Sequence, residues 1–263
     1  MNTDDILNNH YENNYEEDGR FDKDKAHRIE FITTKKYIDK YIKLGDRILE
    51  IGAGTGAYTI HYAKQGYEID AVELVQFNLD LLKSKITTEM KVNTKHGNAL
   101  NLDSYEDNTF DITLLFGPLY HLFTQEDRQK AISEAIRVTK PSGIIFIAYL
   151  TNDSIIVNYF LRKGHMAELP KMIKDGSYRL IDDPKEVFTG FHLDEFEKHV
   201  DLPNIEKIKN VAADGISYVL REYVDALSED DFTKWLGYHF ATCENRDLQG
   251  YSMHMLYICK KKE

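Results

Sequence analysis

Cysteine is nearly absent from the sequence: only Cys243 and Cys259 occur among 263 residues, and they form no CxxC pair. Disulfide frameworks and thiolate zinc sites both need more cysteines at characteristic spacings. We therefore expect two free thiols and no bound metal.

Long apolar runs and an excess of positive charge are missing too. No stretch reaches the roughly 18 apolar residues that a membrane-spanning helix needs, and the opening MNTDDILNNHYENNYEEDG has no secretory-signal pattern. A formal net charge of −11 disfavours nucleic acid and anionic membranes, because Lys and Arg drive binding to both. We expect a cytoplasmic monomer or homodimer with neither partner.

Strand and helix patterns alternate from about residue 46 onward. Helical spacing of apolar residues separates successive apolar strand segments. The expected strands are 47–51, 67–74, 92–99, 110–116 and 143–150, and the expected helices are 57–66, 77–86 and 126–140. This alternation predicts an α/β fold with a doubly wound, mostly parallel sheet.

A glycine-rich loop follows the first strand. Gly52, Gly54 and Gly56 stand where ligands bind in such sheets, at the carboxyl ends of the strands. With Ala57, the first two glycines also satisfy the GxGxxA dinucleotide fingerprint. The glycines alone therefore leave a choice between a dinucleotide and another adenosine-containing cofactor.

Acidic and amide side chains near this loop favour the second alternative. Glu50, two residues before the first glycine, would repel a pyrophosphate but attract a ligand ammonium group, which S-adenosylmethionine carries. Glu73 ends the second strand, where its oxygens can accept both hydroxyl groups of a ribose. Asn98, after the third strand, offers an oxygen to an adenine amino group.

Motifs along most of the chain resemble those of class I S-adenosylmethionine-dependent methyltransferases. They are LEIGAGTG, Glu73, GNA at 97–99, FDITLLFGPLYHL and RVTKPSG. GPLYHL, FTGFH and LQGYSMHMLYICKK look like a small-molecule subgroup of that family. The resemblance implies a seven-stranded Rossmann-like sheet whose last two strands, 205–212 and 251–261, form an antiparallel hairpin.

The resemblance also implies a set of cofactor-binding residues. They are Glu50, Gly52, Ala53, Gly54, Gly56, Glu73, Leu74, Asn98, Ala99 and Phe116. The family usually has Asp where this chain has Asn98. Tyr11 and Tyr15 are expected on an N-terminal lid over the cofactor, and Arg28 is a candidate partner of the cofactor carboxylate.

Two residues after the fourth strand are candidates for catalysis. A general base is useful only if the methyl acceptor must lose a proton, and His121 or Tyr120 could then accept it. Alternatively, His121 orients the loop or supports the cofactor. The segment Gly117-Pro118-Leu119-Tyr120 lacks the Asn/Asp-Pro-Pro-Tyr motif of nucleic-acid and amide methyltransferases, which favours a small-molecule acceptor.

The expected domain organisation has four parts. They are an N-terminal cap (1–30), a cofactor-binding core (31–150), an inserted cap (151–191) and a C-terminal part of the core (192–263) with a helical insertion at 213–250. In that insertion, Phe232, Trp235, Leu236 and Phe240 share helical spacing and either pack the insertion against the sheet or line the pocket.

Three functions are compatible with these patterns. The leading hypothesis is an S-adenosylmethionine-dependent methyltransferase that modifies an oxygen, nitrogen or sulfur of a small molecule. A non-catalytic S-adenosylmethionine sensor is the second hypothesis, because no strong catalytic constellation is visible. An NAD-dependent reductase, which rests on the GxGxxA pattern alone, ranks last.

Overall fold

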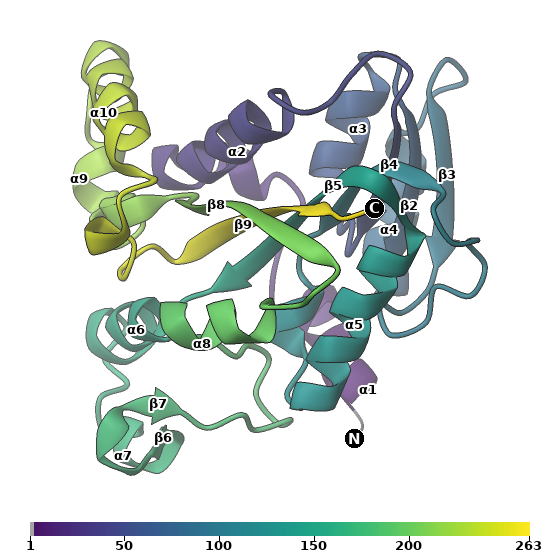
Figure 1. The fold of residues 1–263 in the computed structure, drawn as a ribbon. Coiled ribbons are helices and arrows are strands. Elements are labelled where there is room, and N and C mark those ends of the chain that lie inside the picture. The colour runs from purple at the N-terminus through teal and green to yellow at the C-terminus, as the bar shows by residue number, and fades with distance from the viewer. Residues whose placement is uncertain (1–2) are drawn as a thin grey trace.

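A seven-stranded sheet forms the centre of the computed structural model, which describes residues 3–263 (Figure 1). The strand order is β3-β2-β1-β4-β5-β9-β8. Strands β1 to β5 are parallel, whereas β9 runs antiparallel to both β5 and β8. The bounds are β1 Arg47–Ile51, β2 Glu68–Glu73, β3 Lys91–His96, β4 Phe110–Leu115, β5 Thr139–Leu150, β8 Ile205–Ala212 and β9 His254–Lys261. The predicted doubly wound sheet and its C-terminal hairpin are confirmed.

Helices cover both faces of this sheet. In Figure 1, α2 (Lys25–Ile38) and α3 (Ala57–Ala63) lie on one side, and α5 (Gln125–Val138) and α8 (Leu193–His199) lie on the other. The remaining core helix, α4, spans Gln76–Lys85. Since apolar side chains are covered on both faces, the central strands read as continuous apolar runs, and Ile48, Leu49 and Phe146 are fully buried.

Strand ends differ from the predictions at three places. β5 begins at Thr139, which pairs with Phe110 across a register shift, so the strand includes the turn-like segment predicted to precede it. β3 ends at His96 and β9 begins only at His254. Strand ends depend on pairing with a neighbour, which a local apolar pattern does not report.

The segment after β5 folds into small elements of its own. They are α6 (Asn152–Ile155), a π-helical turn (Ile156–Arg162), α7 (Leu169–Met172) and the two-stranded sheet β6 (Ile173–Lys174) and β7 (Arg179–Leu180). In this segment, Phe160, Leu169 and Leu180 form a buried apolar cluster separate from the main core. Next, α8 begins after His192, which is its N-cap residue.

The second insertion contains α9 (Arg221–Asp225) and α10 (Glu229–Thr242). Phe232 is buried against Ile29 of α2, with Trp235 and Leu236 beside it. Of the two predicted alternatives, packing describes Phe232, Trp235 and Leu236 better than lining the pocket, but they pack against α2 and α9 rather than against the sheet.

The N-terminal residues form α1 (Thr3–Asn13) and the short turn Arg20–Asp22 before α2 begins. Because α2 runs from Lys25 to Ile38, it crosses the predicted boundary between cap and core at residue 30. Among residues 3–263, no helix has the length and apolar character needed to cross a membrane.

Candidate functional site

A cavity of about 900 Å³ opens at the carboxyl ends of the parallel strands. Ile51, Glu73, Phe116 and Leu150, from the ends of β1, β2, β4 and β5 or just beyond, all line it. This is the edge at which open α/β sheets bind their ligands. The topology thus brings together residues that lie up to 99 positions apart.

The glycine loop forms one wall of the cavity. Gly52 has φ +82°, and a Cβ atom there would lie 2.2 Å from the Phe116 carbonyl oxygen, so only glycine fits between β1 and the β4 loop. Gly54 also lines the cavity. Gly56, predicted to bind the cofactor, instead packs against Leu82 of α4 and precedes α3.

Glu73 is the buried acid of this wall. Its Oε2 accepts a hydrogen bond from the Gly54 N–H (2.7 Å) and its Oε1 accepts one from the Val75 N–H (2.8 Å). Burial raises the pKa of this carboxyl, although the backbone donors oppose the rise. The two amides fix the carboxylate and leave each oxygen a further lone pair for a ligand hydroxyl group.

Residues after β2 and β3 continue the lining. Leu74, Asn98 and Ala99 all face the cavity, as predicted. Asn98 Oδ1 accepts a hydrogen bond from the Leu100 N–H at 2.9 Å, which fixes the amide. Asn78, on α4, was missed: its Oδ1 is buried at the cavity and has no hydrogen-bond partner among the described residues.

Glu50 lies beside the large cavity rather than in its wall. With Ala53 it lines an adjoining space of about 60 Å³ that also touches Gly52 and Gly54. Its Oε2 accepts a hydrogen bond from the Thr59 hydroxyl group at 2.5 Å. Burial raises the pKa of Glu50 to about 8. Binding of a cation at this loop would therefore favour ionisation of a carboxyl that is otherwise largely protonated at neutral pH.

Helix α1 and the residues after it close the cavity from the other side. Tyr11 and Tyr15, predicted lid residues, both line it, and the Tyr15 ring stacks on His10 with 5.5 Å between ring centroids. The hydroxyl group of Tyr11 lies 3.0 Å from His121 Nε2. Aromatic faces at such a position attract a cationic ligand by roughly 0.5 to 2 kcal/mol.

The two predicted catalytic residues differ in their surroundings. His121 is buried and its Nδ1–H donates to the Val187 carbonyl (2.7 Å), so the neutral ring presents Nε2 to Tyr11. Burial lowers the pKa of His121 to about 4, which makes it a weak base. Tyr120 lines the cavity, and burial raises the pKa of its hydroxyl group.

Arg28, the predicted partner of a cofactor carboxylate, is not among the residues that line the cavity. Its guanidinium lies 3.6 Å from Glu229 and over the ring of Phe232, on the face of α2 that meets α10. Arg20 lies at the cavity instead and donates to Glu17 (3.2 Å) and to both oxygens of Glu30 (2.7 and 3.0 Å). The only feature of the sequence that could have pointed to Arg20 is its place between Tyr15 and Phe21 in the N-terminal segment.

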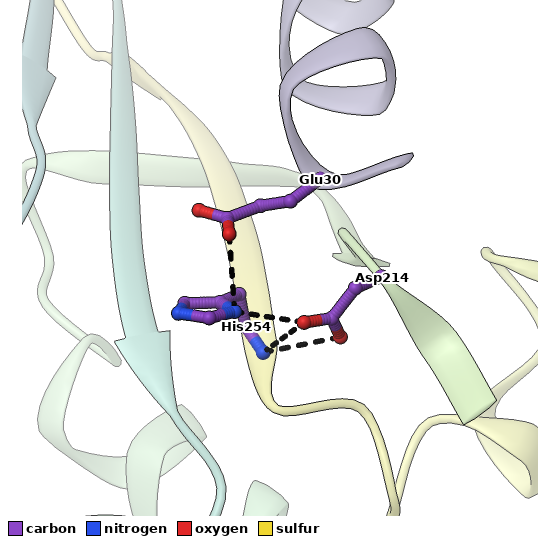
Figure 2. Close-up of side chains that lie close together, drawn as sticks. All are labelled: Glu30, Asp214 and His254. Carbon is purple, nitrogen blue, oxygen red and sulfur yellow. Dashed lines mark hydrogen bonds and ion pairs between the residues drawn. The ribbon is translucent and has the colours of Figure 1, made fainter. Parts of the chain in front are cut away.

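A buried ionic cluster adjoins Arg20. Glu30, Asp214 and His254 come from α2, the loop after β8 and the start of β9 and converge on one another (Figure 2). Of the three, His254 lines the large cavity. Their ligand atoms lie within 4.8 Å of one another, although the sequence predicted no metal site. Sequence reasoning missed these residues because His254 lies in a segment that was interpreted only as a strand.

The cavity fits S-adenosylmethionine in chemistry and in size. A fixed carboxylate at Glu73 suits ribose hydroxyl groups, Glu50 suits an ammonium group and the unpartnered Asn78 Oδ1 offers an acceptor. A volume of about 900 Å³ lies at the upper end of the range for small-molecule sites.

Comparison with known proteins points to the same class. Residues 49–147 match the family described as "Methyltransferase domain". A demethylmenaquinone methyltransferase of Paenarthrobacter aurescens is 35% identical over 108 residues, which cover 41% of this chain and 40% of that protein. An uncharacterized protein of Haemophilus influenzae is 25% identical over 82% of this chain and 84% of its own length. The chain spans about two fifths of the first curated relatives that it matches.

Solved structures share the whole architecture. A Methanosarcina mazei S-adenosylmethionine-dependent methyltransferase aligns with a TM-score of 0.58 and 18% identity, covering 86% of this chain and 97% of that one. A Thermotoga maritima protein described as a possible histamine N-methyltransferase aligns with a TM-score of 0.58 and 17% identity, over 98% and 99%. The chain has the Rossmann-like fold of these neighbours, and residues 49–147 within it match the methyltransferase domain. The match to the methyltransferase domain indicates S-adenosylmethionine as the cofactor.

Proposed function

We propose that this protein is a methyltransferase that transfers the methyl group of S-adenosylmethionine to a small-molecule acceptor. The observation that carries the proposal is Glu73, a buried carboxylate held by two backbone amides at the end of β2, in the wall of the large cavity. Such a group accepts hydrogen bonds from a ribose and repels a 2′-phosphate.

The other residues in and beside the cavity have roles in this proposal too. Glu50 and the glycine loop hold the methionyl end, Asn98 and Ala99 hold the adenine, and Tyr11 and Tyr15 of the lid exclude water. When bound, S-adenosylmethionine supplies a methyl group that its sulfonium has already activated. The protein's main task is then to position the acceptor, and good positioning is worth roughly 7 to 11 kcal/mol of barrier.

A small acceptor is supported by the rest of the lining and by relatives. Tyr159, Phe160, Ile181 and Phe188 of the inserted segment add apolar side chains to the lining of the cavity. The names of two relatives, a demethylmenaquinone methyltransferase and a glycine/sarcosine N-methyltransferase, refer to small molecules. The net charge of −11 disfavours a nucleic-acid acceptor.

Calorimetric titration with S-adenosylmethionine, S-adenosylhomocysteine and NAD tests the proposal. We expect micromolar binding of the first two, lost in Glu73→Ala and kept in Glu68→Ala, a control on the same strand whose side chain is half exposed. Binding of NAD alone would overturn the assignment. Binding of S-adenosylmethionine without turnover of any acceptor would favour the sensor hypothesis.

A further inference from the structure

His254 stands at the edge of the cavity because of the register of the last strand. It is the first residue of β9 and pairs with Leu150, the last residue of β5. Since β9 runs antiparallel to β5, its beginning lies at the edge where the parallel strands end. The imidazole therefore reaches the same cavity as Gly52 and Phe116, and it lines both that cavity and the adjoining space at Glu50.

Two carboxylates fix the orientation and the tautomer of this ring. Nδ1 lies 2.7 Å from Asp214 Oδ2 and 3.2 Å from Glu30 Oε2 (Figure 2). Carboxylates accept hydrogen bonds, so Nδ1 carries the proton and the lone pair of the neutral ring is on Nε2. Figure 2 shows Nε2 on the opposite side of the ring from both carboxylates.

The supporting residues are themselves held in place. Asp214 is fully buried, and its Oδ1 accepts hydrogen bonds from the Ser252 hydroxyl group (2.7 Å) and the His254 N–H (3.2 Å). Arg20 occupies both oxygens of Glu30. With these oxygens taken, the cluster suits an oriented imidazole better than a divalent cation.

The charge of the cluster favours proton uptake by His254. Glu30 and Asp214, together with Glu17 that also pairs with Arg20, leave a formal charge of −2 beside one guanidinium, which an imidazolium reduces to −1. Burial lowers the pKa of His254, but Glu30 and Asp214 outweigh it and bring the pKa above the ordinary value of 6.5. The groups facing the ring are Glu30, Asp214, Arg20 and the edge-on ring of Tyr218. His121, with a pKa of about 4 and Nε2 bound to Tyr11, lacks these properties.

We propose that His254 is the general base of the reaction and that the acceptor is a hydroxyl compound. This inference rests on the proposed methyltransferase function. The acceptor O–H bond breaks and its proton moves to Nε2, while the freed electron pair on oxygen forms the bond to the methyl carbon. The carbon–sulfur bond breaks with its electrons remaining on sulfur, and the imidazolium later returns its proton to water. Asp214 is a positioning residue.

Variants of His254 and Asp214 separate this role from cofactor binding. Removal of a general base costs roughly 100-fold or more in kcat. We expect that loss in His254→Ala, partial rescue by added imidazole, and an affinity for S-adenosylhomocysteine that changes less than threefold. His192→Gln, a partly exposed histidine paired with Asp153, is the control and keeps full activity. Methyl transfer is measured with benzyl alcohol and 4-methylphenol against benzylamine and benzyl mercaptan.

A second readout does not depend on turnover. NMR titration of the ligand-free protein should show His254 as the Nδ1–H tautomer with a pKa above 6.5, and this pKa should fall in Asp214→Asn. In the wild type, kcat should rise with pH through the pKa of His254. Asp214→Glu keeps the charge if the asparagine variant does not fold.

Several results would overturn the inference. An Nε2–H tautomer of His254, or full activity of His254→Ala, would do so. So would activity that a chelator abolishes and a divalent cation restores, or the absence of methyl transfer to both hydroxyl probes. A wild-type protein that binds S-adenosylhomocysteine but fails these tests loses only the inference about His254. A protein that does not bind S-adenosylhomocysteine loses the proposed function itself.

Discussion

The hydroxyl group of Tyr11 lies 3.0 Å from Nε2 of His121, across 110 positions of sequence. On the other side of the same ring, Nδ1–H donates to the carbonyl group of Val187, in the inserted segment after β5. His121 therefore joins the N-terminal helix to the insertion at the cavity. This arrangement favours the orienting role of His121 over the catalytic one.

The contact between Tyr11 and His121 predicts how the lid controls ligand release. Tyr11→Phe removes one hydrogen bond, worth about 0.5 to 1.5 kcal/mol, and keeps the ring. We expect S-adenosylhomocysteine to dissociate roughly 2- to 10-fold faster, as measured by stopped-flow fluorescence. Tyr223→Phe, at a side chain that is 74% exposed, is the control. An unchanged dissociation rate would show that α1 does not close the site through this contact.

Buried histidines predict a loss of stability in acid. His121 has a pKa of about 4 in the folded protein and an ordinary value of 6.5 in the unfolded chain. Between these values the unfolded chain binds a proton that the folded protein does not, so the free energy of unfolding decreases as pH falls from 6.5 to 4.

Urea denaturation at several pH values measures this effect. One such proton contributes a slope of up to about 1.4 kcal/mol per pH unit. His121→Gln should reduce the slope by that amount, whereas the exposed His165→Gln should leave it unchanged. Equal slopes for the wild type and His121→Gln would contradict the prediction.

The sheet could be predicted from the sequence because its signals are local. Ile48 and Ile145 belong to apolar runs that only strands covered on both faces produce, and Glu73 follows from its spacing after the glycine loop. The hydroxyl and backbone contacts that fix Glu50 and Glu73 were not predictable, since they depend on how helices pack.

The cluster of Glu30, Asp214 and His254 shows why the rest of the candidate site was not predictable from the sequence. Glu30, Asp214 and His254 are distant in sequence, and only the antiparallel register of β9 brings the last of them to the cavity. Arg20 lies in the short turn before α2, whereas Arg28 lies on α2 itself, and helical periodicity does not tell which face of α2 meets α10. For this reason the sequence could not show that Arg28 lies outside the lining of the cavity.

Substitution of Glu50 should raise the stability of the protein and weaken its binding of the cofactor. Its pKa of about 8 lies above the ordinary value of 4.5, so its contribution to stability is full below pH 4.5 and is lost as pH rises through 8. Glu50→Gln mimics the protonated acid and should be more stable than the wild type at pH 8.5, by about 1 kcal/mol or more. It should also bind S-adenosylhomocysteine at least about tenfold more weakly, because a charge-assisted hydrogen bond to the ammonium group is lost.

Thermal unfolding and calorimetry at pH 6 and 8.5 check both effects of Glu50→Gln. Glu68→Gln, whose side chain is half exposed, is the control and should change neither property beyond the loss of its ion pair with Arg47. Unchanged binding by Glu50→Gln would show that Glu50 supports Thr59 and takes no part in holding the cofactor.

Replacing Gly52 by alanine should lower stability through both backbone strain and a steric clash, and the same change at Gly45 measures the strain alone. Gly52 and Gly45 both have positive φ, +82° and +92°, but a Cβ atom at Gly45 meets nothing within 4 Å, whereas at Gly52 it would lie 2.2 Å from the Phe116 carbonyl oxygen. Gly45→Ala should therefore cost only the backbone strain, about 1 to 2 kcal/mol. Gly52→Ala should cost more in urea denaturation and should also weaken S-adenosylhomocysteine binding, because relieving the clash moves the loop that donates to Glu73. Equal costs for the two variants would mean that β1 and the β4 loop can separate without loss, and that the narrow fit at Gly52 does not shape the cofactor site.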